Sequence, residues 1–173
     1  YGDYGLHVFN SGSLAYLKDK ELESACVSYE LRFAQIRDLK KVLRAEAIVY
    51  GRLPLMITEN CLVQNETGCR LNRQGPCVPE DGPCRCGQPN VLVDRTGAAF
   101  PLLPAYGHRT EIQNSKPLYL ADRPEHRRLG LAYARLRFTT ETAEECVSVV
   151  QNYLDAAPAA GDFTRGLYER GVE

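Results

Sequence analysis

Five of the chain's seven cysteines fall within 26 residues, between Cys61 and Cys86. Their spacing is Cys-x7-Cys-x7-Cys-x6-Cys-x-Cys, which matches neither the paired knuckles of zinc ribbons nor the compact ferredoxin run. Thiolates are soft ligands that suit zinc or iron, and a loop of this length lets several of them meet at one centre. The stretch therefore predicts a metal or iron–sulfur site. The alternatives are reduced surface thiols or a disulfide formed on handling.

Acid–base chemistry has fewer candidates. The three histidines are His7, His108 and His126, and neither Gly-x-Ser-x-Gly nor His-Glu-x-x-His occurs. His126 lies in an arginine-rich segment and is expected in a solvated charged loop. Glu30 and Glu46 lie at or near predicted strand ends and would serve as an acid–base pair if their side chains converge. The alternative for Glu46 is a core ion pair or a surface position.

Arginines and aromatic residues alternate late in the chain. Such a mixture binds phosphates and stacks on bases in RNA-binding proteins, although a solvated charged face is the simpler interpretation. The residues are Arg123, Arg127, Arg128, Tyr133, Arg135, Arg137 and Phe138.

The elements that would position these groups alternate between strands and helices. Strands are predicted at 5–9, 25–29 and 45–50, with helices from residue 13 and over 30–41. This order is typical of βαβ units in a parallel sheet or barrel, whose ligands lie at the carboxyl ends of the strands. The strand ends point to His7, Asn10, Ser28, Glu30, Tyr50 and Arg52. Beyond the cysteines, the sequence predicts a β-hairpin at 91–100, a strand within 130–139 and a capped amphipathic helix at 143–154.

Bulk properties indicate a globular chain. It has 173 residues, of which 44% are hydrophobic and 25% charged, with a formal net charge of -1. No apolar run is long enough to span a membrane and no secretory signal is visible, so a cytoplasmic location without a membrane partner is expected. The chain begins with Tyr1 rather than Met, which favours a fragment of a longer protein.

Three stretches carry a family resemblance. Glu46-Ala-Ile-Val-Tyr-Gly-Arg-Leu-Pro-Leu-Met56, Glu59-Asn-Cys61 and Leu92-Val-Asp-Arg-Thr-Gly-Ala-Ala-Phe-Pro101 resemble peptidase family U32, the collagenase-like proteases, as do segments 5–11 and 163–173. The resemblance implies the carboxyl-terminal portion of a longer α/β protein. Its parts would be the last β/α units of a TIM-like barrel at 1–56, a cysteine-rich metal-binding loop at 57–90 and a small β-rich α+β region at 91–173.

The resemblance also implies function. Family members are labelled peptidases, and several relatives act in RNA or ubiquinone hydroxylation and hold an iron–sulfur cluster on four cysteines. A 4Fe-4S cluster is therefore expected, with zinc as the alternative. The chain departs from the family pattern where Tyr50-Gly51 replaces a His-Gly pair and Pro54 replaces a cysteine. The candidate metal ligands are Cys61, Cys69, Cys84, Cys86 and His108, leaving out Cys77.

Three functions compete at this point: a peptidase, an iron–sulfur-dependent RNA hydroxylation protein, and a non-catalytic fragment whose loop is ordered by zinc. The expected partners are the upstream half of the same barrel and a peptide or RNA substrate, and the fragment alone is expected to be inactive. The candidate catalytic residues are Glu30, Glu46, Tyr50 and Arg52.

Overall fold

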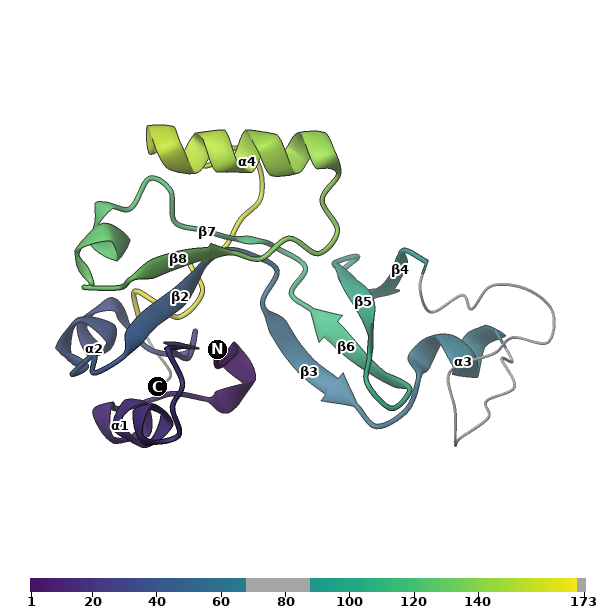
Figure 1. The fold of residues 1–173 in the computed structure, drawn as a ribbon. Coiled ribbons are helices and arrows are strands. Elements are labelled where there is room, and N and C mark those ends of the chain that lie inside the picture. Colours follow the sequence, from purple (N-terminus) through teal and green to yellow (C-terminus); the bar gives the residue numbers. More distant parts are fainter. Residues whose placement is uncertain (68–87, 171–173) are drawn as a thin grey trace. The chain divides into compact units, whose positions relative to one another are not determined.

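The computed structural model describes residues 1–67 and 88–170. The chain divides into two compact units (Figure 1). Unit 1 combines Tyr1–Gly51 with Pro117–Glu173, and unit 2 is Arg52–Lys116. Unit 1 is thus built from two segments that lie far apart in the sequence. Together the units form a mixed α/β protein.

Unit 1 is organised around strand β2 (Arg44–Gly51), most of whose residues are buried. Strands β1 (Ser24–Cys26) and β8 (Tyr133–Leu136) both run parallel to β2, and β7 (Leu118–Tyr119) pairs antiparallel with its last two residues. Isolated parallel bridges at Gly2 and Val8 place the N-terminal segment alongside β1. Among the described residues these strands do not close into a barrel.

Short helices surround this sheet. They are η1 (Tyr4–Leu6), α1 (Ser11–Asp19), α2 (Phe33–Asp38), η3 (Pro124–Arg128) and α4 (Ala143–Asp155). The helix predicted at 143–154 is confirmed as α4, whose N-terminus carries a capping box between Thr142 and Glu145. The helix predicted over 30–41 is shorter, because Leu39 at its C-terminus adopts an extended conformation.

The strand predicted at 5–9 is wrong. The Asp3 side chain accepts a hydrogen bond from the Tyr4 main-chain N–H at 2.7 Å, which starts the single 3-10 turn of η1 instead. His7 ends that turn in the left-handed region, with φ of 46°. Only Val8 of the predicted strand forms a β-bridge, with Val27. Local capping thus overrides the β-forming composition of this segment.

The C-terminal tail belongs to the core of unit 1. Tyr168 is 1% exposed, its ring stacks on Phe33, and its Oη donates to the Ile48 carbonyl at 2.5 Å. Arg165 forms a bidentate ion pair with Asp122 at 2.6 and 2.7 Å, which holds the pKa of that carboxyl below its ordinary value. The tail therefore contributes directly to the stability of unit 1.

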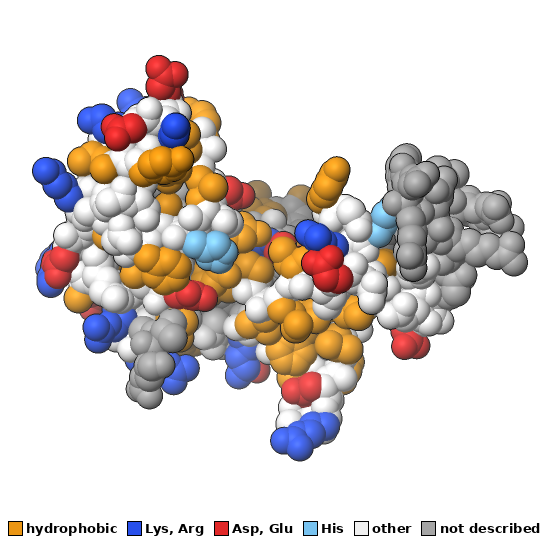
Figure 2. All heavy atoms as spheres, turned by 90° about the horizontal axis from the view of Figure 1, so that it is seen from below, with side chains coloured by type: hydrophobic (Ala, Val, Ile, Leu, Met, Phe, Trp, Pro, Cys, Tyr) orange, Lys and Arg blue, Asp and Glu red, His pale blue; other side chains and the backbone are white. Residues whose placement is uncertain are grey.

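Unit 2 is an antiparallel sheet in the order β3-β6-β5-β4 with one short helix. Its elements are β3 (Pro54–Thr58), α3 (Leu62–Thr67), β4 (Asn90–Val93), β5 (Ala99–Ala105) and β6 (Arg109–Gln113). The hairpin predicted at 91–100 is confirmed as β4 and β5, and Asp94 closes its turn by accepting from the Thr96 and Ala98 main-chain N–H groups. Figure 2 shows hydrophobic side chains gathered on this unit, where Leu55, Met56 and Ile57 of β3 are exposed.

Candidate functional site

Glu46 lies on β2 and forms an ion pair with Arg135 of the neighbouring strand β8. The same guanidinium also pairs with Asp3, so that one arginine joins two carboxylates. The Glu46 side chain is 12% exposed and that of Asp3 is 64% exposed. Burial alone would lower the pKa of Arg135, but the hydrogen bonds to Glu46 and Asp3 outweigh it and raise the pKa above its ordinary value. The arrangement matches the core ion pair that the sequence left open for Glu46.

Cys26, the residue of β1 directly opposite Glu46, is fully buried beside this ion pair. Burial raises the pKa of its thiol to about 12, and the nearby carboxylates of Glu46 and Asp3 add to the effect while Arg135 opposes it. The thiol is therefore protonated near neutral pH and has little nucleophilic character. Cys26 is a core residue.

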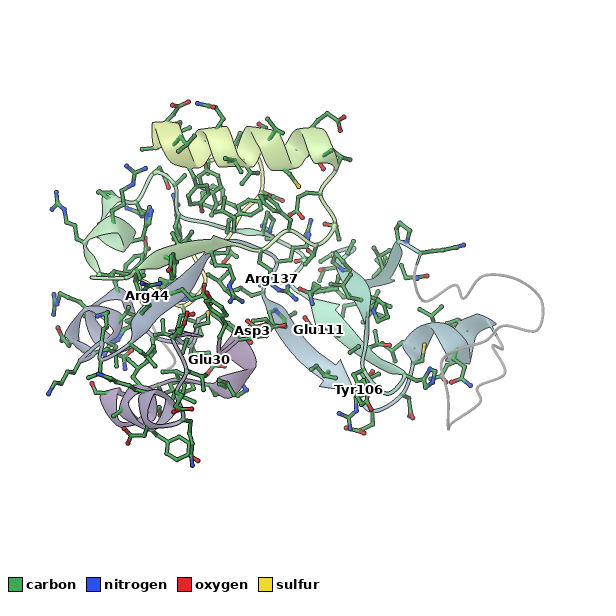
Figure 3. The ribbon with its side chains drawn as sticks, viewed as in Figure 1. Asp3, Glu30, Arg44, Tyr106, Glu111 and Arg137 are labelled. Carbon is green, nitrogen blue, oxygen red and sulfur yellow. The ribbon has the colours of Figure 1, made fainter. Side chains whose placement is uncertain are left out.

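Glu30 follows β1 in a tight turn, where its main-chain N–H donates to Ser28 Oγ at 3.3 Å. Its side chain is partly buried. Figure 3 labels Asp3, Glu30 and Arg137 on three separate segments of unit 1. Glu30 and Glu46 thus belong to the same unit, but the partner that the structure gives Glu46 is Arg135.

Tyr50 and Arg52 are two residues apart yet belong to different units. Tyr50 is buried within unit 1 in a group of aromatic rings, and its Oη donates to Glu141 Oε1 at 3.2 Å. Arg52 donates within unit 2 to the main-chain carbonyls of Asn114, at 3.0 Å, and Ser115. Tyr50 therefore has a hydrogen-bond partner within unit 1, and Arg52 has its partners within unit 2.

Cys61 is the one predicted cysteine ligand that the structure describes, since Cys69, Cys84 and Cys86 lie outside the described residues, as does Cys77. It is a free, buried thiol directly before α3, in an apolar cluster with Val63, Leu102 and Ile112. The next residue, Leu62, donates its main-chain N–H to Thr110 Oγ1 at 3.0 Å. This hydrogen bond ties the start of α3 to strand β6.

His108 lies in the turn between β5 and β6, two residues before Thr110, with φ of 60°. Beside it, Arg109 forms an ion pair with Glu59 at 3.0 Å. This ion pair and the Leu62–Thr110 hydrogen bond bring the segments that carry Cys61 and His108 to the same end of unit 2. Over residues 1–67 and 88–170 no group of three or more His, Cys, Asp or Glu side chains could hold a metal ion.

Four of the five arginines of the late segment have partners within unit 1. Arg123 pairs with Glu169 at 2.7 Å, Arg127 donates to the Tyr153 carbonyl at 2.7 Å, and Arg137 lies 5.3 Å from the centre of the Tyr4 ring. Together with the Arg135 ion pairs, these contacts favour a structural role for the cluster over RNA binding. Sequence reasoning missed Asp3 as the partner of Arg135.

The expectation for His126 is wrong, because its side chain is buried and only 6% of it is exposed. Its Nδ1 lies 2.5 Å from the Arg123 carbonyl oxygen, and its ring meets the edge of Tyr153. Burial is the largest influence on the imidazole and lowers its pKa below the ordinary value. The charged neighbours of His126 are exposed, and they led to the wrong prediction because His126 itself faces the interior.

No helix within the described part of the chain has the length and apolarity needed to cross a membrane. The strands around β2 and the helices of the same unit define a mixed α/β protein. The family model for peptidase family U32 matches residues 5–95, just over half of the 173 residues, and the chain belongs to this family. Comparisons with the curated proteins and with the solved structures found no match.

Proposed function

We propose that the chain is part of a U32-family peptidase whose cysteine-rich stretch holds a metal or iron–sulfur centre. Family membership supports the peptidase class. The observation that carries the metal proposal is the position of Cys61, a buried free thiol held at the start of α3 by the Leu62–Thr110 hydrogen bond. A thiol fixed in this way has lost most of its conformational freedom before a metal binds, which favours ligation.

The donor set fits a soft metal. Cys61 would act with Cys69, Cys84 and Cys86, and His108 is the fifth candidate because its turn lies at the same end of unit 2 as Cys61. Bound zinc would order the segment, whereas an iron–sulfur cluster would add the capacity for electron transfer. The cysteine thiols must lose their protons to become ligands, so binding would weaken as the pH falls.

The N-terminal segment, β1 and β2 run parallel and adjacent, as the last strands of a TIM-like barrel do. An upstream half of the same protein would complete such a barrel, with Glu30 just beyond the carboxyl end of β1 and Glu46 near the amino end of β2. Glu46 would act as the general base toward a water molecule beside the scissile peptide bond, with the ion pair to Arg135 orienting its carboxylate.

Metal analysis of anaerobically purified protein tests the centre. About four iron with matching sulfide supports a 4Fe-4S cluster, about one zinc supports the structural metal, and the absence of both overturns the metal proposal. The variant Cys61→Ser is expected to lower the metal content, whereas Cys146→Ser on α4 is the matched control because it leaves the candidate ligands intact.

The peptidase proposal has a separate test. The full-length protein should hydrolyse denatured collagen, and Glu46→Gln should abolish the activity while Glu144→Gln, an exposed glutamate on α4, leaves it unchanged. A thermal melt of each variant shows whether a loss of activity arises from unfolding. Full activity in a folded Glu46→Gln protein would exclude Glu46 as the base.

A further inference from the structure

Helix α4 presents an apolar stripe to solvent. Val147, Val150 and Leu154 are spaced by three and four residues and therefore share one face of the helix, where they are 70%, 42% and 70% exposed. Ala143, one turn before Val147, extends the same stripe and is also exposed. Exposed apolar side chains that are contiguous over three turns are uncommon on a protein surface without a partner.

The opposite face of α4 is already used by unit 1. Val149 is buried in the cluster around Tyr50 and Tyr119. Tyr153 Oη donates to the Val49 carbonyl at 2.5 Å and accepts from the Leu120 N–H at 2.8 Å. Figure 3 shows side chains on both faces of α4, some directed toward the sheet and others away from it. The helix is thus anchored on one side, and the described residues of unit 1 leave the side chains of its stripe exposed.

The charged residues of α4 itself all have one sign. From residue 138 to residue 164 the chain contains five acidic residues and no Lys, Arg or His, although its overall formal charge is only -1. Glu141 accepts a hydrogen bond from Tyr50 and Glu145 accepts one from the Thr142 N–H of the capping box, whereas Glu144 and Asp155 lie exposed on α4. Arg127 of η3 reaches the last turn, where it donates to the Tyr153 carbonyl. Because Arg127 lies at the last turn, the acidic part of the helix surface is at its first turns, where Glu144 is exposed.

We propose that this α4 stripe is a docking site for an amphipathic helix of a partner protein that carries Lys or Arg beside its own apolar residues. Apolar residues at helical spacing would pack against Val147, Val150 and Leu154, and a basic residue would face the exposed Glu144. The stripe includes none of the residues of the proposed peptidase and metal chemistry, so the inference goes beyond that function.

A second copy of the chain fits the stripe less well. Three side chains on a short helix bury on the order of a few hundred Å² per partner, below the roughly 800 Å² of a standard interface. Two copies would also bring two acidic helices together, and like charges oppose association. A basic partner helix removes that repulsion.

A synthetic helical peptide serves as the probe. It has leucines spaced by three and four residues with lysines beside them, and a matched peptide has glutamate in place of each lysine. Fluorescence anisotropy with the full chain is measured at low and at physiological salt. The lysine peptide should bind more tightly at low salt, and the glutamate peptide should not bind.

Substitutions on α4 test whether the lysine peptide binds at the stripe. The double change Val147→Gln and Leu154→Gln should weaken binding of the lysine peptide at least tenfold, and Glu144→Gln should weaken it several-fold at low salt. Tyr16→Gln on α1, another exposed apolar residue at 61% exposure, is the control and should bind normally. Circular dichroism checks that each variant is folded. Equal binding by the double variant, binding of the glutamate peptide, or a chain dimer that the double variant dissociates would each overturn the proposal.

Discussion

Thr110 of β6 accepts the main-chain N–H of Leu62 at 3.0 Å and so fixes the residue that directly follows Cys61. Thr58 Oγ1 donates to the Thr110 carbonyl at 3.3 Å, which draws the end of β3 to the same point. One threonine therefore joins the strand before Cys61 and the helix after it. The position of this candidate ligand depends on a strand that lies 48 residues further along the chain.

Replacing Thr110 with valine tests this role. The change keeps the side-chain shape but leaves the Leu62 N–H without its acceptor, so we expect the free energy of unfolding to fall by about 1 kcal/mol. If the metal proposal holds, metal content should also fall. Thr96→Val in the exposed β4–β5 turn is the control. It also removes a threonine hydroxyl, but that hydroxyl donates to Asp94 and lies in a segment far from Cys61 in sequence. Equal metal loss in both variants would contradict a specific role for Thr110.

The Glu46–Arg135 ion pair predicts a non-additive effect on stability. Arg135→Met leaves a carboxylate that is only 12% exposed without its cation, which should lower the free energy of unfolding by about 1–3 kcal/mol. Adding Glu46→Gln removes the unpaired charge, so the double variant should recover part of that loss. Urea denaturation of the two single variants and the double variant at neutral pH measures the coupling. Strict additivity would show that the two side chains do not interact.

His126 predicts that stability decreases in mild acid. Its pKa is lowered in the folded state by burial, so the unfolded chain takes up the proton first as the pH falls. The stabilising contribution is present above the ordinary histidine pKa of about 6.5 and is lost as the pH drops through the lowered folded-state value. Urea midpoints at pH 7.5 and 5.5 should differ more for the parent chain than for His126→Gln. His7 and His108 are present in both proteins and cancel in this comparison.

Tyr153 should be important for the attachment of α4. Its hydroxyl bridges the Val49 carbonyl and the Leu120 N–H, and Tyr153→Phe removes both hydrogen bonds while keeping the ring. We expect a loss of about 1–3 kcal/mol in the free energy of unfolding, measured by chemical denaturation. Tyr16→Phe, at an exposed position on α1, should have almost no effect. Similar losses in both variants would mean that the bridge contributes little.

Several elements were predictable from the sequence because their signals are local. Helix α4 combines an amphipathic pattern with acidic residues in its first turn, and the β4–β5 hairpin has a turn closed by Asp94. Strand β2 is nearly continuous in buried residues, as its composition indicates. The stretches that resemble peptidase family U32, from Glu46 onward, also predicted the family from sequence alone. The family model confirms that membership.

The side-chain environments needed the tertiary structure. The distribution of charges around His126 predicts exposure, yet its ring turns inward against Tyr153. Asp3 and Arg135 are 132 residues apart, and Glu46 and Arg135 are 89 apart, so neighbouring residues carry no trace of these pairings. At η1 a single capping aspartate decided between strand and turn.

The sequence by itself determined the family, the local elements with strong periodicity or capping, and the grouping of cysteines that could bind a metal. Only the tertiary structure decided that segments at both ends of the chain build one unit around β2, with Arg52–Lys116 forming the other. The physical reason is that periodicity and capping act between residues a few positions apart. Burial and ion pairing depend instead on which distant segments the fold brings into contact.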